Sequence, residues 1–245
     1  MDDNTGRISF VAGATGLTGR EVVRLLAQRG DVVTAHVRPD SSRLDEWTER
    51  FTAMGATVDS TPWDEAAMTA TLTTLAPHRV FGLLGTTAKR ARAARSSGED
   101  ASYEAVDYGL TALLYRASQA AGCTPTFVYL SSAGVSDRAP GAYLRARAKV
   151  ERDLRAGDLP YVVARPSFIV GDRDTPRPTE KVGSVFGDAA LALLGAVGAK
   201  RTASKWMSLT GEALAAGMIA LSDKPGSAGR IFDSADLREA ALTVS

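Results

Sequence analysis

The sequence has few of the residues that bind metals or form disulfide bonds. Its 245 residues include one cysteine, Cys123, and two histidines, His36 and His78. A single cysteine cannot form a disulfide within the chain, and one cysteine with two histidines is too small a set for a zinc site of these ligands. The sequence therefore predicts no metal centre. It also offers no convincing base for a Ser-His-Asp hydrolase, because both histidines lie far in sequence from the candidate serines.

The sequence also lacks an excess of either charge and lacks a long apolar run. Its 29 Lys and Arg residues against 28 Asp and Glu residues leave a net charge of +1, which favours neither a nucleic acid nor a membrane surface as partner. The stretch 189–199 has 11 residues without a charge or hydroxyl, whereas a membrane-spanning helix needs roughly 20. The acidic start, Asp2 and Asp3, lacks the basic region of a secretory signal peptide. We expect a cytoplasmic location.

Short apolar runs alternate with amphipathic segments along the first two thirds of the chain. The pattern predicts strands separated by helices, with strands at about residues 8–12, 31–37, 57–58, 80–84, 126–130 and 161–164. The strands are apolar on both faces, which indicates a parallel sheet covered by helices on either side. The predicted fold class is α/β, a doubly wound Rossmann fold with strand order 3-2-1-4-5-6. A late strand at residues 230–232 would add a seventh.

The composition indicates an ordinary globular chain, with 44% hydrophobic and 23% charged residues. No Gly/Ser-rich linker or repeat divides it, so we interpret residues 1–245 as a single nucleotide-binding domain. The regular alternation ends near Pro166, and an Ala-rich helix is expected at about residues 188–199. We expect residues 166–230 to form a small cap on the substrate side.

A glycine-rich turn lies between the first expected strand and the first expected helix. Gly13, Gly16 and Gly19 have the spacing G-x-x-G-x-x-G. The first glycine permits a tight turn, the second lets the backbone approach a pyrophosphate, and the third allows close packing of the helix. The amino end of the helix favours phosphate, so this motif in this context predicts dinucleotide binding. The predicted contacts are Gly13, Thr15, Gly16, Leu17, Thr18 and Gly19.

The residue after the second expected strand bears on which dinucleotide binds. Enzymes that use NAD place an acidic residue there on the ribose 2′-hydroxyl, whereas this chain has Arg38. A guanidinium can give a 2′-phosphate two charge-assisted hydrogen bonds, so Arg38 favours NADP(H) over NAD(H). A solvated Arg38 with Asp40 as the ribose partner is the alternative. Asp59, after the third strand, is either an acceptor for the adenine amino group or an ordinary turn aspartate.

Motifs after the later strands match one family. They are Leu84-Gly85-Thr86-Thr87, Val106-Asp107, Ser131-Ser132-Ala133-Gly134, Tyr143-Leu144 and Arg165-Pro166. With the glycine turn, they resemble the atypical short-chain dehydrogenase/reductase superfamily, especially its NmrA-like NAD(P)-binding members and oxidoreductases of the HIV Tat-interactive protein type. The resemblance runs along the whole chain and is most specific between residues 80 and 172.

The resemblance implies roles for residues at the ends of the strands. The cofactor would lie along Leu84, Gly85 and Thr86 and beside Ser132, while its nicotinamide end would touch Pro166, Phe168 and Ile169. The resemblance also implies a Ser-Tyr-Lys reductase arrangement. Ser131 takes the serine role, with Ser132 as the alternative, and Tyr143 takes the acid/base role. Arg147 stands where the family pattern Y-x-x-x-K has lysine.

The replacement of lysine by arginine affects the expected chemistry. Hydride transfer to a carbonyl makes its oxygen negative, and a hydroxyl donor with a phenol that gives up its proton stabilises that charge. A free tyrosine has a pKa of about 10, so a nearby cation must lower it. Arg147 lies on the same helix face as Tyr143 and supplies a cation, which can also hold the ribose. Its own pKa, above roughly 12, prevents it from relaying protons.

The residues and the resemblance together indicate an NADP(H)-dependent oxidoreductase that transfers hydride to or from a small organic carbonyl or alcohol. A second hypothesis is a non-catalytic NADP(H)-binding regulator of the NmrA-like type, which senses redox state and passes it to a protein partner. A third, an epimerase or dehydratase using the same cofactor transiently, is less favoured because the C-terminal part is short for a nucleotide-sugar pocket. Nothing in the sequence indicates a particular oligomeric state.

Overall fold

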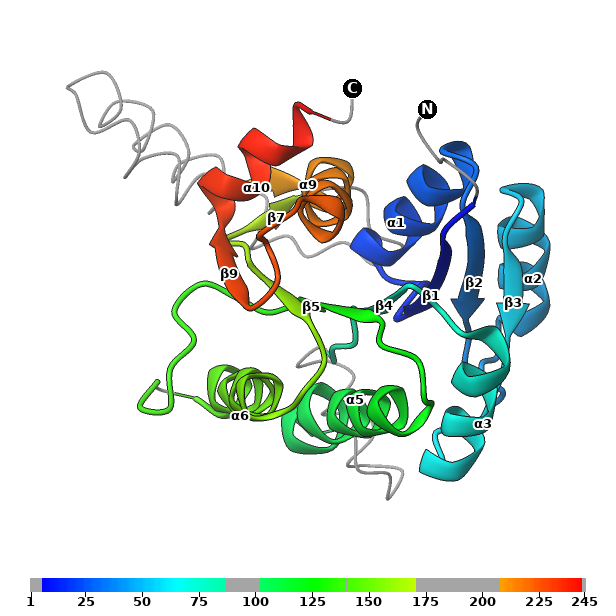
Figure 1. Ribbon diagram of the computed structural model, residues 1–245, viewed down its shortest axis with the longest axis horizontal. Coiled ribbons are helices and arrows are strands. Elements are labelled where there is room, and N and C mark those ends of the chain that lie inside the picture. Colours follow the sequence, from blue (N-terminus) through cyan, green and yellow to red (C-terminus); the bar gives the residue numbers. More distant parts are fainter. Residues whose placement is uncertain (1–5, 87–101, 140, 171–207, 244–245) are drawn as a thin grey trace.

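A parallel sheet forms the centre of the protein (Figure 1). The computed structural model describes residues 6–86, 102–139, 141–170 and 208–243. The strands of the sheet are β1 (Ile8–Ala12), β2 (Val32–His36), β3 (Thr57–Asp59), β4 (Arg79–Gly82), β5 (Thr126–Leu130), β6 (Tyr161–Arg165) and β9 (Arg230–Asp233). Their order is β3-β2-β1-β4-β5-β6-β9, and every neighbouring pair is parallel. The predicted Rossmann fold and strand order are confirmed, and the late strand is the seventh.

Helices cover both faces of the sheet. One face carries α1 (Leu17–Gln28), α2 (Leu44–Ala53), α9 (Gly211–Asp223) and α10 (Ser234–Ala241). The other carries α3 (Glu65–Leu75), the π-helix η1 (Tyr103–Leu110), α5 (Thr111–Ala120) and α6 (Ala142–Ala156). Neighbouring strand residues point to opposite faces, as Phe10 and Val11 do, so most residues of each strand are apolar, with buried polar exceptions such as Ser9 and Arg79. The continuous apolar runs in the sequence follow from this double burial.

Three features differ from the sequence-based expectations. The helix expected from Tyr103 to Ala121 begins as the π-helix η1 and becomes α-helical only at Thr111. A two-stranded sheet of β7 (Ile169–Val170) and β8 (Leu209–Thr210) is too short to show periodicity. The unpredicted helix α10 begins with a capping box. The Asp236 carboxylate accepts the backbone N–H of Asp233, and the Asp233 carboxylate accepts that of Asp236.

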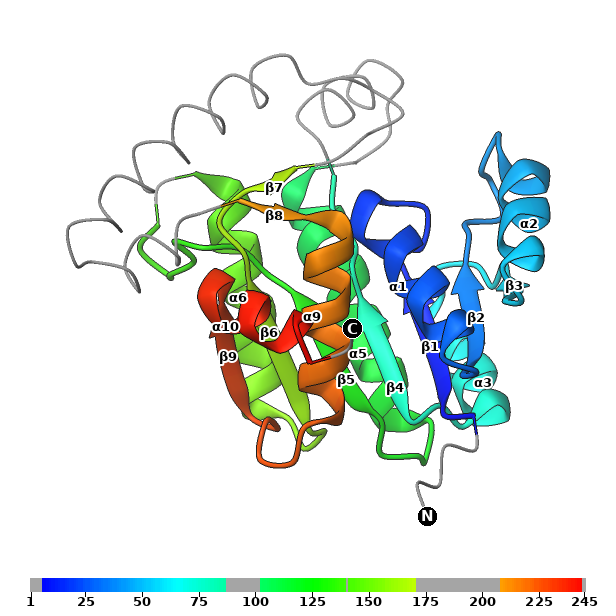
Figure 2. The same cartoon turned by 90° about the horizontal axis from the view of Figure 1, so that it is seen from above.

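The part of the chain expected to form a cap is only partly described. Helix α9 falls within residues 166–230, yet it lies beside α1 on one face of the sheet (Figure 2). Its buried residues, such as Leu214 and Met218, belong to the same apolar cluster as Val22 of α1. Residues 171–207, including the expected helix at 188–199, lie outside the described residues. No helix in the described ranges is long and apolar enough to cross a membrane.

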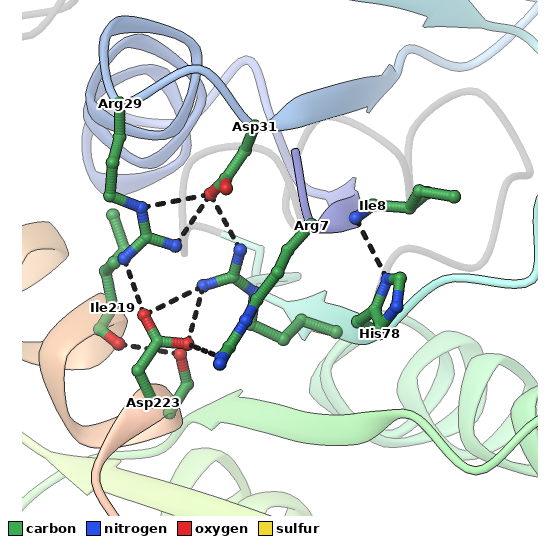
Figure 3. Close-up of polar contacts among 9 residues, drawn as sticks. Arg7, Ile8, Arg29, Asp31, His78, Ile219 and Asp223 are labelled. Carbon is green, nitrogen blue, oxygen red and sulfur yellow. Dashed lines mark hydrogen bonds and ion pairs between the residues drawn. The ribbon is translucent and has the colours of Figure 1, made fainter. Parts of the chain in front are cut away.

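A cluster of ion pairs joins the elements at the amino-terminal ends of the strands (Figure 3). Arg79, the first residue of β4, is 2% exposed and donates to Asp31 at 2.7 Å and to Asp223 at 2.9 Å. Arg29 contacts the same two carboxylates, at 2.7 Å and 2.5 Å, and Arg7 donates to Asp223 at 2.6 Å. These contacts tie the carboxyl ends of α1 and α9 to the starts of β2 and β4. The predicted site lies at the other end of the strands, where their carboxyl ends are.

Candidate functional site

The glycine turn has the geometry that its spacing predicts. Gly13 has φ +82°, and a Cβ there would lie 2.6 Å from the carbonyl oxygen of Leu83. The amide of Gly16 donates to the Gly13 carbonyl at 3.1 Å and closes the turn. A Cβ on Gly19 would overlap the Gly13 carbonyl and lie 2.8 Å from Cα of Ala14. Gly13 and Gly19 are therefore required by the fold of the turn itself.

Gly16 differs from these two because the turn does not need it to be glycine. Its backbone is extended, with φ −73° and ψ 166°, a conformation open to any residue. A Cβ on Gly16 would meet, among the described residues, only the Gly13 carbonyl oxygen at 3.3 Å. That single contact is tight, and the rest of the space beside Gly16 is open, at the point where helix α1 begins.

The amino end of α1 suits an anion. Gly16 provides no side-chain cap, and the first turn holds no acidic residue. The first amide groups of a helix lack partners within it and carry partial positive charge. An open glycine beside an uncapped helix start fits the pyrophosphate of a dinucleotide, with Thr15, Leu17 and Thr18 along the same turn.

The residues expected at the adenosine end lie after β2 and β3. Arg38 pairs with Asp40, Nη1 to Oδ2 at 2.9 Å, and both side chains are exposed. The two alternatives for the ribose thus contact each other in this structure. The Asp59 carboxylate accepts from the amide and the hydroxyl of Thr61 at 3.1 and 2.8 Å. That geometry matches the turn interpretation of Asp59.

Tyr143 and Arg147 lie one turn apart on α6 and face each other. The Arg147 guanidinium carbon is 4.7 Å from the centre of the Tyr143 ring. Arg147 is 5% exposed, and its Nη1 donates to the carbonyl oxygen of Leu130 at the end of β5. Its Nη2 lies 3.5 Å from the Leu84 carbonyl oxygen in the loop after β4. Arg147 therefore joins three segments predicted for the site, namely helix α6 and the loops after β4 and β5.

Asp107, which the sequence analysis named in the motif Val106-Asp107 without giving it a role, completes a buried centre with Tyr143 and Arg147. Asp107 of η1 is fully buried, and its Oδ1 accepts from Nη2 of Arg147 at 3.0 Å. Its Oδ2 accepts from the amide of Thr86 at 2.9 Å. A Cβ on Gly85 would lie 3.1 Å from Arg147 Nη2, so this glycine leaves room for the ion pair. The hydroxyl of Thr86 is buried without a hydrogen-bond partner among the described residues, beside the expected path of the cofactor.

Burial and neighbouring charges shift the pKa values of these groups in opposite directions. Burial raises the pKa of Asp107, against the lowering effects of Arg147 and of the Thr86 amide. Burial opposes the charge of Arg147, but Tyr129, Tyr143 and Asp107 outweigh it, so the pKa of the guanidinium is raised and it stays charged. Burial also raises the pKa of Tyr129, which stays a neutral phenol. The centre therefore holds one permanent cation.

Ser131 and Ser132 lie in different environments. Ser131 is 3% exposed, and its hydroxyl donates to Oε1 of Glu151 at 2.6 Å. Glu151 is buried and also accepts from Arg165 and, at 2.9 Å, from Arg155. Since a serine has one hydroxyl proton, Ser131 has none left for a substrate oxygen. The Ser132 hydroxyl is only partly buried and makes one long contact, 3.3 Å, to the Ala133 carbonyl.

The loop after β6 meets the serine loop. The amide of Ala133 donates to the Pro166 carbonyl at 2.9 Å, which ties the two loops together. Phe168 is 56% exposed, and its carbonyl accepts from the Leu209 amide at 2.8 Å. Ile169 begins β7 and pairs with Leu209 of β8. The residues predicted for the nicotinamide end thus lie beside the serine loop, whereas Thr87 lies outside the described residues.

Sequence reasoning gave no site role to three residues of this region. Asp107 and Glu151 are acidic residues within amphipathic helices, where a solvent-exposed position is the ordinary expectation. Tyr103 lies 5.4 Å, ring centre to ring centre, from Tyr143 in an edge-on contact. Each of them acts through contact between segments far apart in the sequence. The motif Val106-Asp107 was the sequence signal that pointed to Asp107.

The chain belongs to the NAD(P)H-binding family whose model matches residues 13–192. Its relatives include FMP52 proteins. The one from Aspergillus clavatus is 31% identical over 174 residues, covering 69% of this chain and 69% of the relative. The one from Coccidioides immitis is 29% identical over 193 residues, covering 74% and 73%.

Solved structures share the fold. An oxidoreductase of the short chain dehydrogenase/reductase family from Burkholderia thailandensis has a TM-score of 0.63 and 18% identity, covering 91% of this chain and 88% of that one. A nucleoside-diphosphate-sugar epimerase from Pseudomonas aeruginosa has a TM-score of 0.58 and 18% identity, covering 92% and 71%. The chain therefore has an NAD(P)H-binding, oxidoreductase-like fold.

The relatives overturn one expectation. The FMP52 proteins of both fungi are named mitochondrial proteins, which points to the mitochondrion and not to the cytoplasm. The prediction of a cytoplasmic location was wrong because it rested on the acidic start. An acidic start argues against a secretory signal peptide, which does not by itself place a protein in the cytoplasm.

Proposed function

We propose that the protein is an NADP(H)-dependent oxidoreductase that transfers a hydride to or from a small organic carbonyl or alcohol. The observation that carries this proposal is the stacking of the Arg147 guanidinium on the Tyr143 ring at 4.7 Å, beside the carboxyl end of β5. Ligands of such α/β sheets bind outside the carboxyl ends of the strands. An acid/base phenol with a permanent cation at this edge is the equipment of a carbonyl reductase.

The glycine turn and the strand ends would hold the cofactor. Gly13, Gly16 and the amino end of α1 would bind the pyrophosphate, and Arg38 would bind the 2′-phosphate. The nicotinamide, when bound, supplies or accepts the hydride. It would lie between the loop that contains Thr86 and the loop that contains Pro166. The other predicted contacts, Leu84, Gly85, Ser132, Phe168 and Ile169, lie on these loops or on the serine loop that adjoins them.

Three side chains would act on the substrate oxygen or on each other. Tyr143 donates its phenolic proton to the developing alkoxide, or removes one from an alcohol in the reverse direction. Ser132 donates a hydrogen bond to the same oxygen, because the hydroxyl of Ser131 already donates its hydrogen bond to Glu151. Arg147 stabilises the phenolate through its charge, since a cation over a phenol ring favours the ionised form.

One observation favours a second candidate, the redox-sensing regulator. The terminal nitrogens of Arg147 are directed at the carbonyls of Leu130 and Leu84 and at Asp107. A guanidinium held in this way does not relay protons to Tyr143. A protein with such a centre could bind NADP(H) without turnover and pass its redox state to a partner protein.

The two candidates differ in the behaviour of Tyr143 and Arg147 variants. For a reductase, Tyr143→Phe leaves NADPH binding nearly unchanged and lowers carbonyl reduction by roughly 10²-fold or more. Arg147→Lys keeps or raises the rate, because lysine restores a cation that can relay protons. For a sensor, neither the unmodified protein nor Arg147→Lys reduces any member of a panel of aldehydes and ketones. NADPH and NADP⁺ would then bind with different affinities.

A further inference from the structure

Tyr103 places a second aromatic ring beside the proposed acid/base. It is the first residue of η1, and its ring centre lies 5.4 Å from that of Tyr143, with 66° between the ring planes. Edge-on contacts of this kind are favourable for aromatic rings. The side chain of Ser102 accepts the amide of Ala105 at 3.1 Å and caps the start of η1, so the backbone that carries Tyr103 is well defined.

The Tyr103 ring does not serve the packing of the sheet. Tyr103 is partly exposed, and it is not among the side chains that pack against either apolar cluster of the described residues. Tyr108, on the same helix, is also partly exposed but does pack against the cluster between the sheet and α5. The position of Tyr103 beside Tyr143 therefore calls for an explanation at the site.

Other side chains around the serine loop are apolar as well. Phe168 is 56% exposed and lies two residues after Pro166, whose carbonyl accepts the amide of Ala133 at 2.9 Å. A Cβ on Gly134 would lie 3.9 Å from Cδ1 of Leu144, so Leu144 faces the serine loop from α6. The loop that carries the proposed donor Ser132 thus has an aromatic and an aliphatic side chain beside it.

The two arginines on the same part of α6 are engaged within the protein. Arg147 donates to the Leu130 carbonyl and pairs with Asp107 at 3.0 Å. Arg145 donates from Nη1 to the Ala139 carbonyl at 3.3 Å. These contacts direct both guanidinium groups at protein oxygens, which disfavours a substrate that brings a carboxylate of its own.

We propose that Tyr103 is a specificity-determining residue that packs against the substituent of the substrate and favours uncharged aromatic aldehydes and ketones over aliphatic ones of similar size. A carbonyl that reaches the Tyr143 hydroxyl carries its substituent close to the neighbouring ring. An aromatic substituent there gains a ring contact that an aliphatic one does not. The inference rests on the proposed function for the reaction and adds the class of substrate.

A matched pair of aldehydes tests this inference in the full chain with NADPH. Benzaldehyde and cyclohexanecarbaldehyde have the same carbon skeleton, and only the first is aromatic. Because their intrinsic reactivities differ, the informative quantity is how each variant changes the ratio of their kcat/KM values. Tyr103→Leu lowers the ratio of benzaldehyde to cyclohexanecarbaldehyde by about tenfold, since it removes the ring contact. Tyr103→Phe keeps the ratio, and so does the control Tyr108→Leu on the same helix.

A charged substrate tests the second part of the inference. The carboxylate of 4-carboxybenzaldehyde would lose its water beside apolar side chains without gaining a cation. We expect its kcat/KM to be at least tenfold lower than that of benzaldehyde. Equal use of both aldehydes would contradict the preference for uncharged substrates.

The binding of unreactive amides separates this inference from the proposed function. Benzamide and cyclohexanecarboxamide keep the carbonyl oxygen and the substituent, and calorimetry measures their binding to the protein loaded with NADP⁺. Tyr103→Leu should weaken benzamide binding by about tenfold and cyclohexanecarboxamide binding little. A protein that binds the amides in this way but reduces no aldehyde refutes the proposed function alone.

Three results would overturn the inference itself. The first is a protein that reduces aldehydes but whose ratio Tyr103→Leu leaves unchanged. The second is an equal change of the ratio in Tyr103→Leu and in the control Tyr108→Leu. The third is a protein that neither reduces the aldehydes nor binds benzamide more weakly in Tyr103→Leu.

Discussion

The hydroxyl of Ser131 donates to the buried carboxylate of Glu151 at 2.6 Å. Arg165 and Arg155 hold the same carboxylate, so the contact joins the ends of β5 and β6 to the middle of α6. The Ser131 hydroxyl is therefore committed within the protein. Ser132, the next residue, is the hydroxyl left for a substrate.

This relationship separates the effects of two neighbouring substitutions. Ser131→Ala removes a hydrogen bond to a buried charge and lowers the free energy of unfolding by about 1.5–3 kcal/mol, with a small effect on kcat. Ser132→Ala leaves stability nearly unchanged and lowers kcat by roughly 10²-fold, because a donor to the substrate oxygen is lost. Urea denaturation and steady-state kinetics on both variants measure these effects. A rate loss confined to Ser131→Ala would return the catalytic role to Ser131.

The glycine turn allows binding to be changed without unfolding. In Gly16→Val the backbone keeps its extended conformation, while the new methyl groups fill the space beside the amino end of α1. NADPH affinity should fall by roughly 10²-fold or more, about 2.7 kcal/mol, with native circular dichroism and melting temperature. Gly19→Val is the contrasting variant, since its side chain would overlap the Gly13 carbonyl and destabilise the fold. Unchanged NADPH binding by Gly16→Val would place the phosphates elsewhere.

The contact between Arg38 and Asp40 means that substitution of either residue tests the choice between NADPH and NADH. If Arg38 binds the 2′-phosphate, NADPH binds at least tenfold more tightly than NADH, about 1.4 kcal/mol, and Arg38→Ala removes most of that preference. Asp40→Asn frees Arg38 from its ion pair and strengthens NADPH binding. Fluorescence titration of both cofactors against the three proteins gives these values. Equal affinities in the unmodified protein, or weaker NADH binding in Asp40→Asn alone, would instead favour Asp40 as the ribose partner.

The burial of His36 makes stability depend on pH. His36 is 3% exposed, its Nε2 donates to the Thr61 carbonyl at 2.8 Å, and burial lowers its pKa below the ordinary value of 6.5. Below pH 6.5 the unfolded chain gains a proton that the folded protein does not, so the free energy of unfolding decreases as pH falls. The slope is at most about 1.4 kcal/mol per pH unit and ends below the lowered pKa of His36.

His36→Gln removes this contribution while keeping an N–H donor for Thr61. Urea denaturation of both proteins across the mildly acidic range should show a smaller decrease of stability in the variant as pH falls. The same decrease in both proteins would mean that another group is responsible.

The sequence predicts the sheet well for a physical reason. Strands buried on both faces, such as β1 and β5, are mostly apolar, and short turns between strand and helix leave few ways to connect them. The glycine turn is largely local, since Gly16 and Gly19 lie against the Gly13 carbonyl, although Gly13 itself also lies against Leu83 of the loop after β4. Both could therefore be predicted mainly from neighbouring residues.

The interior of the site depends on contacts that no local pattern shows. Asp107 is buried because Thr86 and Arg147, both far away in sequence, satisfy its carboxylate. Ser131 has the predicted position but not a free proton, because Glu151 approaches it from another element. Such roles follow from tertiary structure, so the sequence could identify the residues of the centre only in part.

The transfer of a labelled hydride from NADPH to a carbonyl distinguishes a reductase from a regulator without turnover. NADPH carrying deuterium at the transferable C4 position is mixed with the protein and a panel of small aldehydes and ketones, and mass spectrometry detects the label in the alcohol. We expect label in the product of at least one carbonyl. Its rate of formation should fall by roughly 10²-fold or more in Tyr143→Phe, while NADPH binding stays unchanged. The protein is not a reductase if NADPH binds but no carbonyl takes up the label, and Tyr143 is not its acid/base if Tyr143→Phe transfers the label as fast as the unmodified protein.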